Sequence, residues 1–293
     1  MVRPPAARAR AVLIGAALAL FAGPAPAATP ASWEVTVAVR LNNDAGAPVS
    51  VRIALPPNDE LQELGDVDVQ ARGLTATVVR DGDEPHVELR GKLKGARRIA
   101  VSYVVHRERA IGILPVIGPL DAPPPALLPF LMPSPTFQSR SILVRDFLET
   151  NAAPILSAPG APDLVRTLHQ VTREHFTWAG DGKTLTLDVI RSGSGKRIGI
   201  ERVFTTFLRC AHIPARFVEG INLASTTHRK RVFWTEVWGQ NRWWPLSASL
   251  GWIGRLPKAY IALTRDGQRA VQIEGAVESS YAIQARPLPD TPS

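Results

Sequence analysis

Cys210 is the only cysteine of the chain, and a thiol paired with a histidine base is the arrangement used by cysteine hydrolases and acyltransferases. The candidate base is His228. However, Cys210 falls near the predicted end of a helix, where the negative end of the helix dipole raises the pKa of a thiol. His228 stands in the basic run His228-Arg229-Lys230-Arg231, which is typical of a solvated loop. We therefore interpret Cys210 as a buried structural residue and keep the active cysteine enzyme as the alternative.

Other reactive residue types form no pattern that predicts a cofactor. A single cysteine excludes a disulfide scaffold, a cysteine-based zinc site and an iron–sulfur cluster. The six histidines lack metal-ligand spacing, and no glycine-rich loop of the phosphate-binding type is present. The carboxylates of Asp181, Asp188, Glu201 and Glu219 form no pair that would indicate glycosidase chemistry. We expect neither a metal nor another cofactor.

Five tryptophans gather in one third of the chain, and they would lie in two strands and the loop after them: Trp234, Trp238, Trp243, Trp244 and Trp252. In an extended strand Trp234, Glu236 and Trp238 share one face. The favoured interpretation is core and cleft wall. A platform for carbohydrate or peptide that includes Trp234 is the alternative.

Residues 1–27 have the pattern of a secretory signal peptide. Three arginines precede an apolar run at residues 11–22, and Ala25-Pro26-Ala27 supplies a small-residue cleavage site. The run is shorter than the roughly 20 residues needed to span a bilayer, so we expect cleavage before Ala28 rather than a retained anchor. Without the three arginines the formal charge falls from +8 to +5, too little to indicate nucleic-acid binding. We expect a periplasmic or secreted protein that does not span the membrane after cleavage.

The first half of the mature chain is predicted to be a small antiparallel β-sandwich. Apolar residues alternate with polar ones at residues 33–41 and 49–55, and shorter strands are expected at 74–79, 86–89 and 99–105. Eight prolines then fall between residues 115 and 135. Such a run predicts a stiff, extended connector.

The second half has helical spacing followed by strands. Helices are expected at residues 139–150, 162–176 and 196–211, with a turn at Asp181-Gly182 between the last two. Strands are expected at residues 215–221, 231–238, 242–246, 260–264, 270–273 and 280–285. The fold class is therefore α+β. The predicted parts are a signal peptide at 1–27, a β-sandwich domain at 28–108, a proline-rich linker at 109–135, a second domain at 136–286 and a disordered tail at 287–293.

Two motifs of the second domain resemble a known family. The stretch 208–220, LRCAHIPARFVEG, resembles the signature that transglutaminase-like proteins carry between their central helix and the next strand. Residues 233–238, FWTEVW, and 242–245, RWWP, resemble their next two strands. The resemblance covers roughly residues 130–285. It implies a papain-like fold with a central helix packed on an antiparallel sheet.

The resemblance also implies three catalytic positions, which this chain fills with other residues. Counted from the motifs, the cysteine at the start of the central helix is replaced by Arg197, the strand histidine by Val232, and the orienting aspartate by Ser247. Because all three positions are changed, we expect a protein with the scaffold but without the catalytic triad.

A narrower resemblance concerns a bacterial envelope family, the inactive transglutaminases fused to seven transmembrane helices. The chain is similar to their soluble portion, including the tail at residues 256–276. This resemblance implies a binding or regulatory module for an envelope protein or peptide, and a separate multi-helix membrane protein is one such partner.

Within this frame the basic residues become ligand-binding candidates. Lys196 and Arg197 would lie at the start of the central helix, whose backbone N–H groups also attract anions. The candidates His228, Arg229 and Arg231 would lead into a strand that lines the same cleft. The favoured interpretation is a solvated loop, and an anionic ligand bound by these residues in the cleft is the hypothesis that we carry forward.

Overall fold

The computed structural model describes residues 31–43, 46–80, 82, 84–107, 112–158, 163–224, 231–276 and 278–288. The signal peptide expected at residues 1–27 and the candidates His228 and Arg229 lie outside these ranges. The described chain is a mixed α/β structure with mostly antiparallel sheets, as the α+β class predicts. No described helix combines the length and the apolar character needed to cross a membrane.

The first sheet consists of four strands in the order β15-β1-β6-β3. Strand β1 (Ala31–Asn43) pairs along its whole length with β6 (Gly95–Arg107). On the other side of β6 lies β3 (Gln62–Gln70), and β15 (Glu278–Pro287) pairs with β1. Alternate residues of β1 point inward and are buried, as the period-two pattern predicts.

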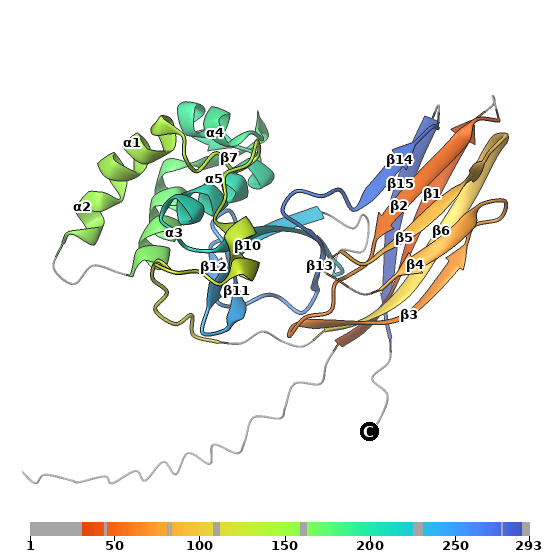
Figure 1. Ribbon diagram of the computed structural model, residues 1–293, viewed down its shortest axis with the longest axis horizontal. Helices are drawn as coiled ribbons and strands as arrows, with labels where there is room; N and C mark the ends of the chain where they lie inside the picture. Colours follow the sequence, from red (N-terminus) through yellow and green to blue (C-terminus); the bar gives the residue numbers. More distant parts are fainter. Residues whose placement is uncertain are drawn as a thin grey trace, which may run out of the picture.

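The second sheet has the order β14-β2-β5-β4. Its strands are β2 (Pro48–Ala54), β4 (Thr75–Val79), β5 (His86–Lys92) and β14 (Val271–Glu274). Inward residues of both sheets, such as Val37, Val51, Leu89 and Val101, belong to one apolar core. We call these eight strands the β-domain, which forms one end of the molecule (Figure 1).

Two assignments in this region differ from the sequence analysis. Strands β14 and β15 were expected in the second domain, at residues 136–286, but they pair with β2 and β1 of the β-domain. An alternating pattern identifies a strand but not the sheet that it joins. Strand β3 was not predicted, because Gly65 and a register shift between Leu64 and Val67 interrupt its alternation.

The proline-rich segment is not a free connector. Leu114 and Ile117 are buried in the core of the helical part, and the Leu120 N–H donates to the carbonyl of His212. A short 3₁₀ helix, η1 (Pro125–Phe130), follows and buries Leu127. The prolines prevent longer regular structure, but the apolar residues between them dock on the second domain.

Five α-helices form the other end of the molecule (Figure 1). The expected helices correspond to α1 (Ile142–Asn151), α3 (Leu164–His175) and α5 (Arg197–Cys210). Two short helices, α2 (Ala153–Leu156) and α4 (Thr186–Ser192), were not predicted. The turn expected at Asp181-Gly182 is wrong, since both residues lie in β7 (Thr177–Lys183). That strand pairs with the two-residue β8 (Ser194–Gly195).

A five-stranded sheet lies between the helices and the β-domain (Figure 1). Its order is β12-β11-β10-β9-β13, with bounds β9 (Ala215–Asn222), β10 (Arg231–Gly239), β11 (Arg242–Ser247), β12 (Trp252–Ile253) and β13 (Tyr260–Arg265). Its helix-side residues Ala215, Val237 and Leu246 join the helical core. Ile221 and Ile261 belong to the core of the β-domain instead. The sheet is therefore buried on both faces.

Candidate ligand-binding cleft

A cavity of about 740 Å³ lies where α5 begins. Its lining comes from β7, the start of α5, and the adjacent ends of β9, β10 and β13, and includes Trp178, Lys196, Arg197, Val232, Phe233 and Tyr260. Two of the three positions that the sequence resemblance assigns to the triad, Arg197 and Val232, thus line one space. We call this space the cleft.

The start of α5 is held closely against β7. The Lys196 N–H donates to the Lys183 carbonyl at 2.9 Å. A side chain at Gly199 would place its Cβ 2.5 Å from the same carbonyl oxygen, so only glycine fits there. Lys196, the residue before the helix, makes no capping hydrogen bond with its side chain. The positive end of the helix dipole therefore faces the cleft without a carboxylate cap.

Lys196 and Arg197 are both exposed at this helix start. The Arg197 guanidinium lies 5.4 Å from the ring centroid of Trp178, a distance at which a cation interacts with an aromatic face. Trp178 is itself 56% exposed. The mouth of the cleft therefore combines two cations with an open aromatic surface.

Arg231 lines the same cleft, but its charge is already balanced. Its Nε and Nη2 donate to the two carboxylate oxygens of Glu219 at 2.5 and 2.6 Å. These hydrogen bonds raise the pKa of Arg231 above its ordinary value. The expected contribution of Arg231 to the positive field is therefore reduced. Among the described lining residues, Lys196 and Arg197 remain as cations without a carboxylate partner.

Ser247, which stands at the aspartate position, is fully buried and does not line the cleft. Its hydroxyl donates to Glu201 Oε1 at 2.5 Å, and the Ser249 N–H donates to the same oxygen at 2.8 Å. The Thr235 hydroxyl donates to Glu201 Oε2 at 3.3 Å. Glu201 is one helical turn after Arg197 in α5. Burial raises the pKa of Glu201, although the hydrogen bonds from Ser247 and Ser249 oppose this.

His169 of α3 lies on the other side of Ser247. Its Nε2 is 3.0 Å from the Ser247 carbonyl oxygen, so this nitrogen carries the proton. The ring meets Phe204 edge to face at 5.6 Å, and burial lowers the pKa of His169. His169 therefore fixes the backbone of β11 as a neutral donor. The sequence analysis found no role for Glu201 or His169, because their partners lie on other elements.

A second buried carboxylate, Glu236, lies on β10 at the junction with the β-domain. Arg216 Nε donates to Glu236 Oε2 at 2.7 Å, and Trp234 Nε1 donates to Oε1 at 3.0 Å. Arg265 Nε is 4.0 Å from Oε2, while Arg265 Nη2 donates to Asp59 of the β-domain at 2.5 Å. Burial alone would raise the pKa of Glu236, but Arg216 and Arg265 outweigh it and lower the pKa.

Two further candidates lie away from the cleft. Trp234 is fully buried in a small apolar cluster with Val218 and Leu256, which corrects its assignment as a ligand-binding residue. Cys210 is the last residue of α5 and packs at the edge of the helical core. Burial raises the pKa of its thiol, so Cys210 lacks the surroundings of an activated nucleophile.

The comparisons with known proteins agree with this geometry. Residues 152–248 match the transglutaminase-like superfamily, so the chain contains a transglutaminase-like domain in this range. The described elements of that range include α5, β10 and β11, which carry the three positions that the sequence resemblance assigns to the triad. No match was found among curated proteins.

Two solved structures are similar to the chain. A candidate cysteine protease from Cytophaga hutchinsonii matches with a TM-score of 0.65 at 13% identity, covering 90% of this chain and 93% of that one. A candidate protease from Parabacteroides distasonis matches with a TM-score of 0.29 at 12% identity, covering 72% of this chain and 43% of that one. The first match supports the fold over nearly the whole chain; at this identity it indicates nothing about activity.

Proposed function

We propose that this protein is a catalytically inactive transglutaminase-like module of the bacterial envelope, with a small β-sandwich as its N-terminal part, whose cleft binds an anionic peptide segment. The observation that carries the proposal is Arg197, an exposed guanidinium at the start of α5, where the family has its cysteine. A fixed cation replaces a nucleophile there. The guanidinium fork matches the two oxygens of a carboxylate.

The surroundings of the other two triad positions also support inactivity. Val232 lines the cleft and has no group that accepts a proton. Ser247 donates its hydroxyl hydrogen bond to Glu201 and is enclosed on all sides. No imidazole of the described residues lines the cleft. Among the described residues of the cleft, neither a base nor an orienting carboxylate therefore supports attack by a nucleophile.

The cleft is suited to an extended peptide with acidic side chains. Trp178, Phe233 and Tyr260 offer aromatic surface along its lining, and Lys196 and Arg197 offer charge at one end. The N–H groups at the start of α5 add to the same positive field. An acidic peptide can pack its apolar surface on the aromatic residues and pair its carboxylates with the two cations.

The proposed location and partner rest on the sequence. The leader pattern at residues 1–27 supports export to the periplasm or beyond. We infer that the chain corresponds to the soluble portion of the inactive transglutaminases fused to seven transmembrane helices. The partner would then be an envelope protein or peptide, and a separate multi-helix membrane protein is the first to test.

The binding test uses a fluorescein-labelled hexaglutamate peptide as the probe and hexaglutamine as its neutral counterpart. We expect the protein to bind hexaglutamate only, and the affinity to fall as salt rises to about 0.15 M, where charges are screened beyond roughly 8 Å. Arg197→Glu should weaken binding at least tenfold. It should leave thermal stability nearly unchanged, because an exposed helix-end cation contributes little to folding.

Arg145→Glu is the matched control. It makes the same charge reversal on an exposed residue of α1, outside the cleft, and should leave binding within about twofold of the wild type, since surface charges away from the site act weakly. Equal binding by Arg197→Glu and the wild type would place recognition elsewhere. Unfolding of Arg197→Glu would make Arg197 a structural residue.

Inactivity is tested separately. We expect no peptidase, amidase or transamidase turnover above the protein-free rate. Cys210→Ala should leave peptide binding intact and cost about 1–2 kcal/mol of unfolding free energy, as a modest truncation in a partly buried position. Turnover that disappears in Cys210→Ala would overturn the proposal in favour of an active cysteine enzyme.

A further inference from the structure

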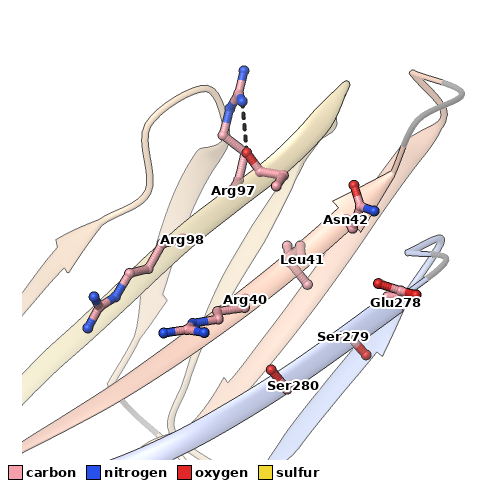
Figure 2. Close-up of a pocket in the computed structure, with 9 residues that line it drawn as sticks. Arg40, Leu41, Asn42, Arg97, Arg98, Glu278, Ser279 and Ser280 are labelled. Carbon is pink, nitrogen blue, oxygen red and sulfur yellow. Dashed lines mark hydrogen bonds between the residues drawn. The ribbon is translucent and has the colours of Figure 1, made fainter.

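A second hollow, of about 600 Å³, lies on the β-domain and shares no lining residue with the cleft. It opens on the outer surface of the first sheet, over β1, β6 and β15 (Figure 2). Its lining includes Arg40, Arg97, Arg98, Glu278, Ser279 and Ser280. Three arginines against one glutamate make this a basic surface.

Two of these arginines face each other directly. Arg40 of β1 and Arg98 of β6 are partners in the strand register, and both are exposed. Like charges at such positions repel and destabilise a sheet. No carboxylate of the described residues lies within ion-pair distance of either one.

Three other arginines of the β-domain are paired with a carboxylate: Arg52 with Glu84, Arg90 with Glu88, and Arg286 with Glu34. Arg40 and Arg98 differ from these three, because the cross-strand partner of each is a second arginine. An anionic ligand would supply the missing negative charge.

The side chains are arranged to act together. In Figure 2 the Arg40 and Arg98 side chains extend in the same direction from neighbouring strands. On the same face of the sheet the next register pair is Ala38 with Ala100, and Ala282 of β15 is the partner of Ala38. These residues do not line the hollow, and they carry no charge that could pair with the two arginines. Glu278 points to the opposite side of the hollow (Figure 2).

The number of donors indicates the kind of anion. One guanidinium fork is enough to pair with both oxygens of a carboxylate. Two adjacent forks offer more N–H groups than a single carboxylate uses, and the Ser280 hydroxyl stands on the strand next to Arg40. A phosphate group has additional acceptor oxygens and more negative charge. We propose that Arg40 and Arg98 form a binding site for a phosphate group on the outer face of the β-domain.

The test uses the full-length mature chain and inorganic phosphate as the probe. Amide chemical shifts of residues 96–98 and 278–280 are followed by NMR while phosphate replaces chloride at constant ionic strength. We expect saturable shifts confined to these strands. The variant Arg40→Gln/Arg98→Gln should weaken binding at least tenfold, and its melting temperature should not fall, because a repulsive pair has been removed.

Two further variants separate a site from general charge. Arg90→Gln removes one exposed charge elsewhere on the β-domain and should bind phosphate as the wild type does. Arg40→Lys/Arg98→Lys keeps both charges but loses the forks, and should bind several-fold more weakly than the wild type. Equal binding by the wild type and Arg40→Gln/Arg98→Gln, or an equal loss in Arg90→Gln, would overturn the proposal.

A second arm distinguishes the sources of the phosphate. Co-sedimentation with vesicles of phosphatidylcholine containing phosphatidylglycerol, lost in Arg40→Gln/Arg98→Gln, would support a lipid headgroup as the ligand. Saturable phosphate binding without vesicle binding would support a soluble phosphorylated ligand. Vesicle binding that is unchanged in the double variant, with no phosphate binding, would refute the site.

Discussion

Glu201 and Glu236 lie in neighbouring parts of the same domain, and both are almost completely shielded from solvent, at 0% and 1% exposure. Their surroundings differ in the charge of the donors. Glu201 accepts hydrogen bonds from hydroxyl and amide groups only, whereas Glu236 meets two arginines. The pKa of Glu201 is raised by burial and that of Glu236 is lowered by the arginines.

The comparison shows what each site requires of its neighbours. Neutral donors satisfy the geometry of a buried carboxyl group but do not offset the desolvation of its charge, whereas a cationic partner does. The junction with the β-domain is therefore an ionic site that depends on both signs of charge. The buried site around Glu201 depends on hydrogen bonds instead. A second carboxylate placed beside Glu201 would have no cation to balance its charge.

The largest loss of unfolding free energy is expected when the ionic site loses the negative charge of Glu236. Glu236→Gln keeps an acceptor for Trp234 but removes the carboxylate that Arg216 contacts directly, leaving only the weaker attraction of Asp59. Breaking a buried pair in this way costs about 3–5 kcal/mol. The unfolding free energy from chemical denaturation at neutral pH measures it. Adding Arg216→Met should recover part of the lost stability. A cost below about 1 kcal/mol for Glu236→Gln would mean that Glu236 does not depend on its charged partners.

A smaller loss is expected when the aspartate of the family pattern is restored at position 247. Ser247→Asp removes the hydroxyl donor and sets a second carboxylate beside Glu201. We expect a cost of about 1–3 kcal/mol, larger than that of Ser247→Ala, which removes only the hydrogen bond. Glu201→Gln in the Ser247→Asp background should restore much of the stability. If Ser247→Asp is as stable as Ser247→Ala, the hydrogen-bonded site tolerates a second anion.

A Glu→Gln substitution, which destabilises the ionic site at Glu236, should change the unfolding free energy very little at Glu201. Glu201→Gln keeps an oxygen for Ser247 and Ser249, and its new amide group can donate to the Thr235 hydroxyl. We expect a change of at most about 1 kcal/mol at neutral pH. Denaturation of Glu201→Gln and Glu236→Gln side by side measures the difference. Equal costs would mean that donor charge does not distinguish the two sites.

The subtlest signal is the pH dependence. The folded pKa of Glu236 is below its ordinary 4.5, so its contribution to stability is present above 4.5 and is lost as the pH falls through the folded value. The folded pKa of Glu201 is above 4.5, so its contribution is full below 4.5 and is lost as the pH rises through the folded value. Relative to each Gln variant, wild-type stability should therefore change in opposite directions with pH. If both stability differences changed with pH in the same direction, the pKa values of Glu201 and Glu236 would not be shifted in opposite directions.

The sequence predicts elements better than it predicts their partners. The alternating pattern located β1, β2 and β6, and the IPAR motif located the end of α5 and the start of β9. From that motif Arg197 could be assigned to the first turn of α5, where it lies. Local periodicity and motif spacing are enough for such statements.

The parts that were missed depend on residues distant in the sequence. The Glu201 partners come from β10, from the end of β11 and from the turn after it, and the pairing of Arg231 with Glu219 joins two strands. A glutamate on an otherwise apolar helix face was the available sign of a buried acceptor, but it does not identify the donors. The placement of Trp234 in the core likewise depends on which face of β10 meets Leu256.

The return of β15 to the first sheet has a consequence for the order of folding. Trp33 pairs with Pro287, and Asn42 pairs with Glu278, so β1 obtains one of its two neighbours only after residues 278–287 have been synthesised. Domains are generally completed in the order in which they are synthesised. Here residues 152–248, which match the transglutaminase-like family, are all synthesised before β15. The β-domain, although it starts earlier in the chain, is therefore completed after them.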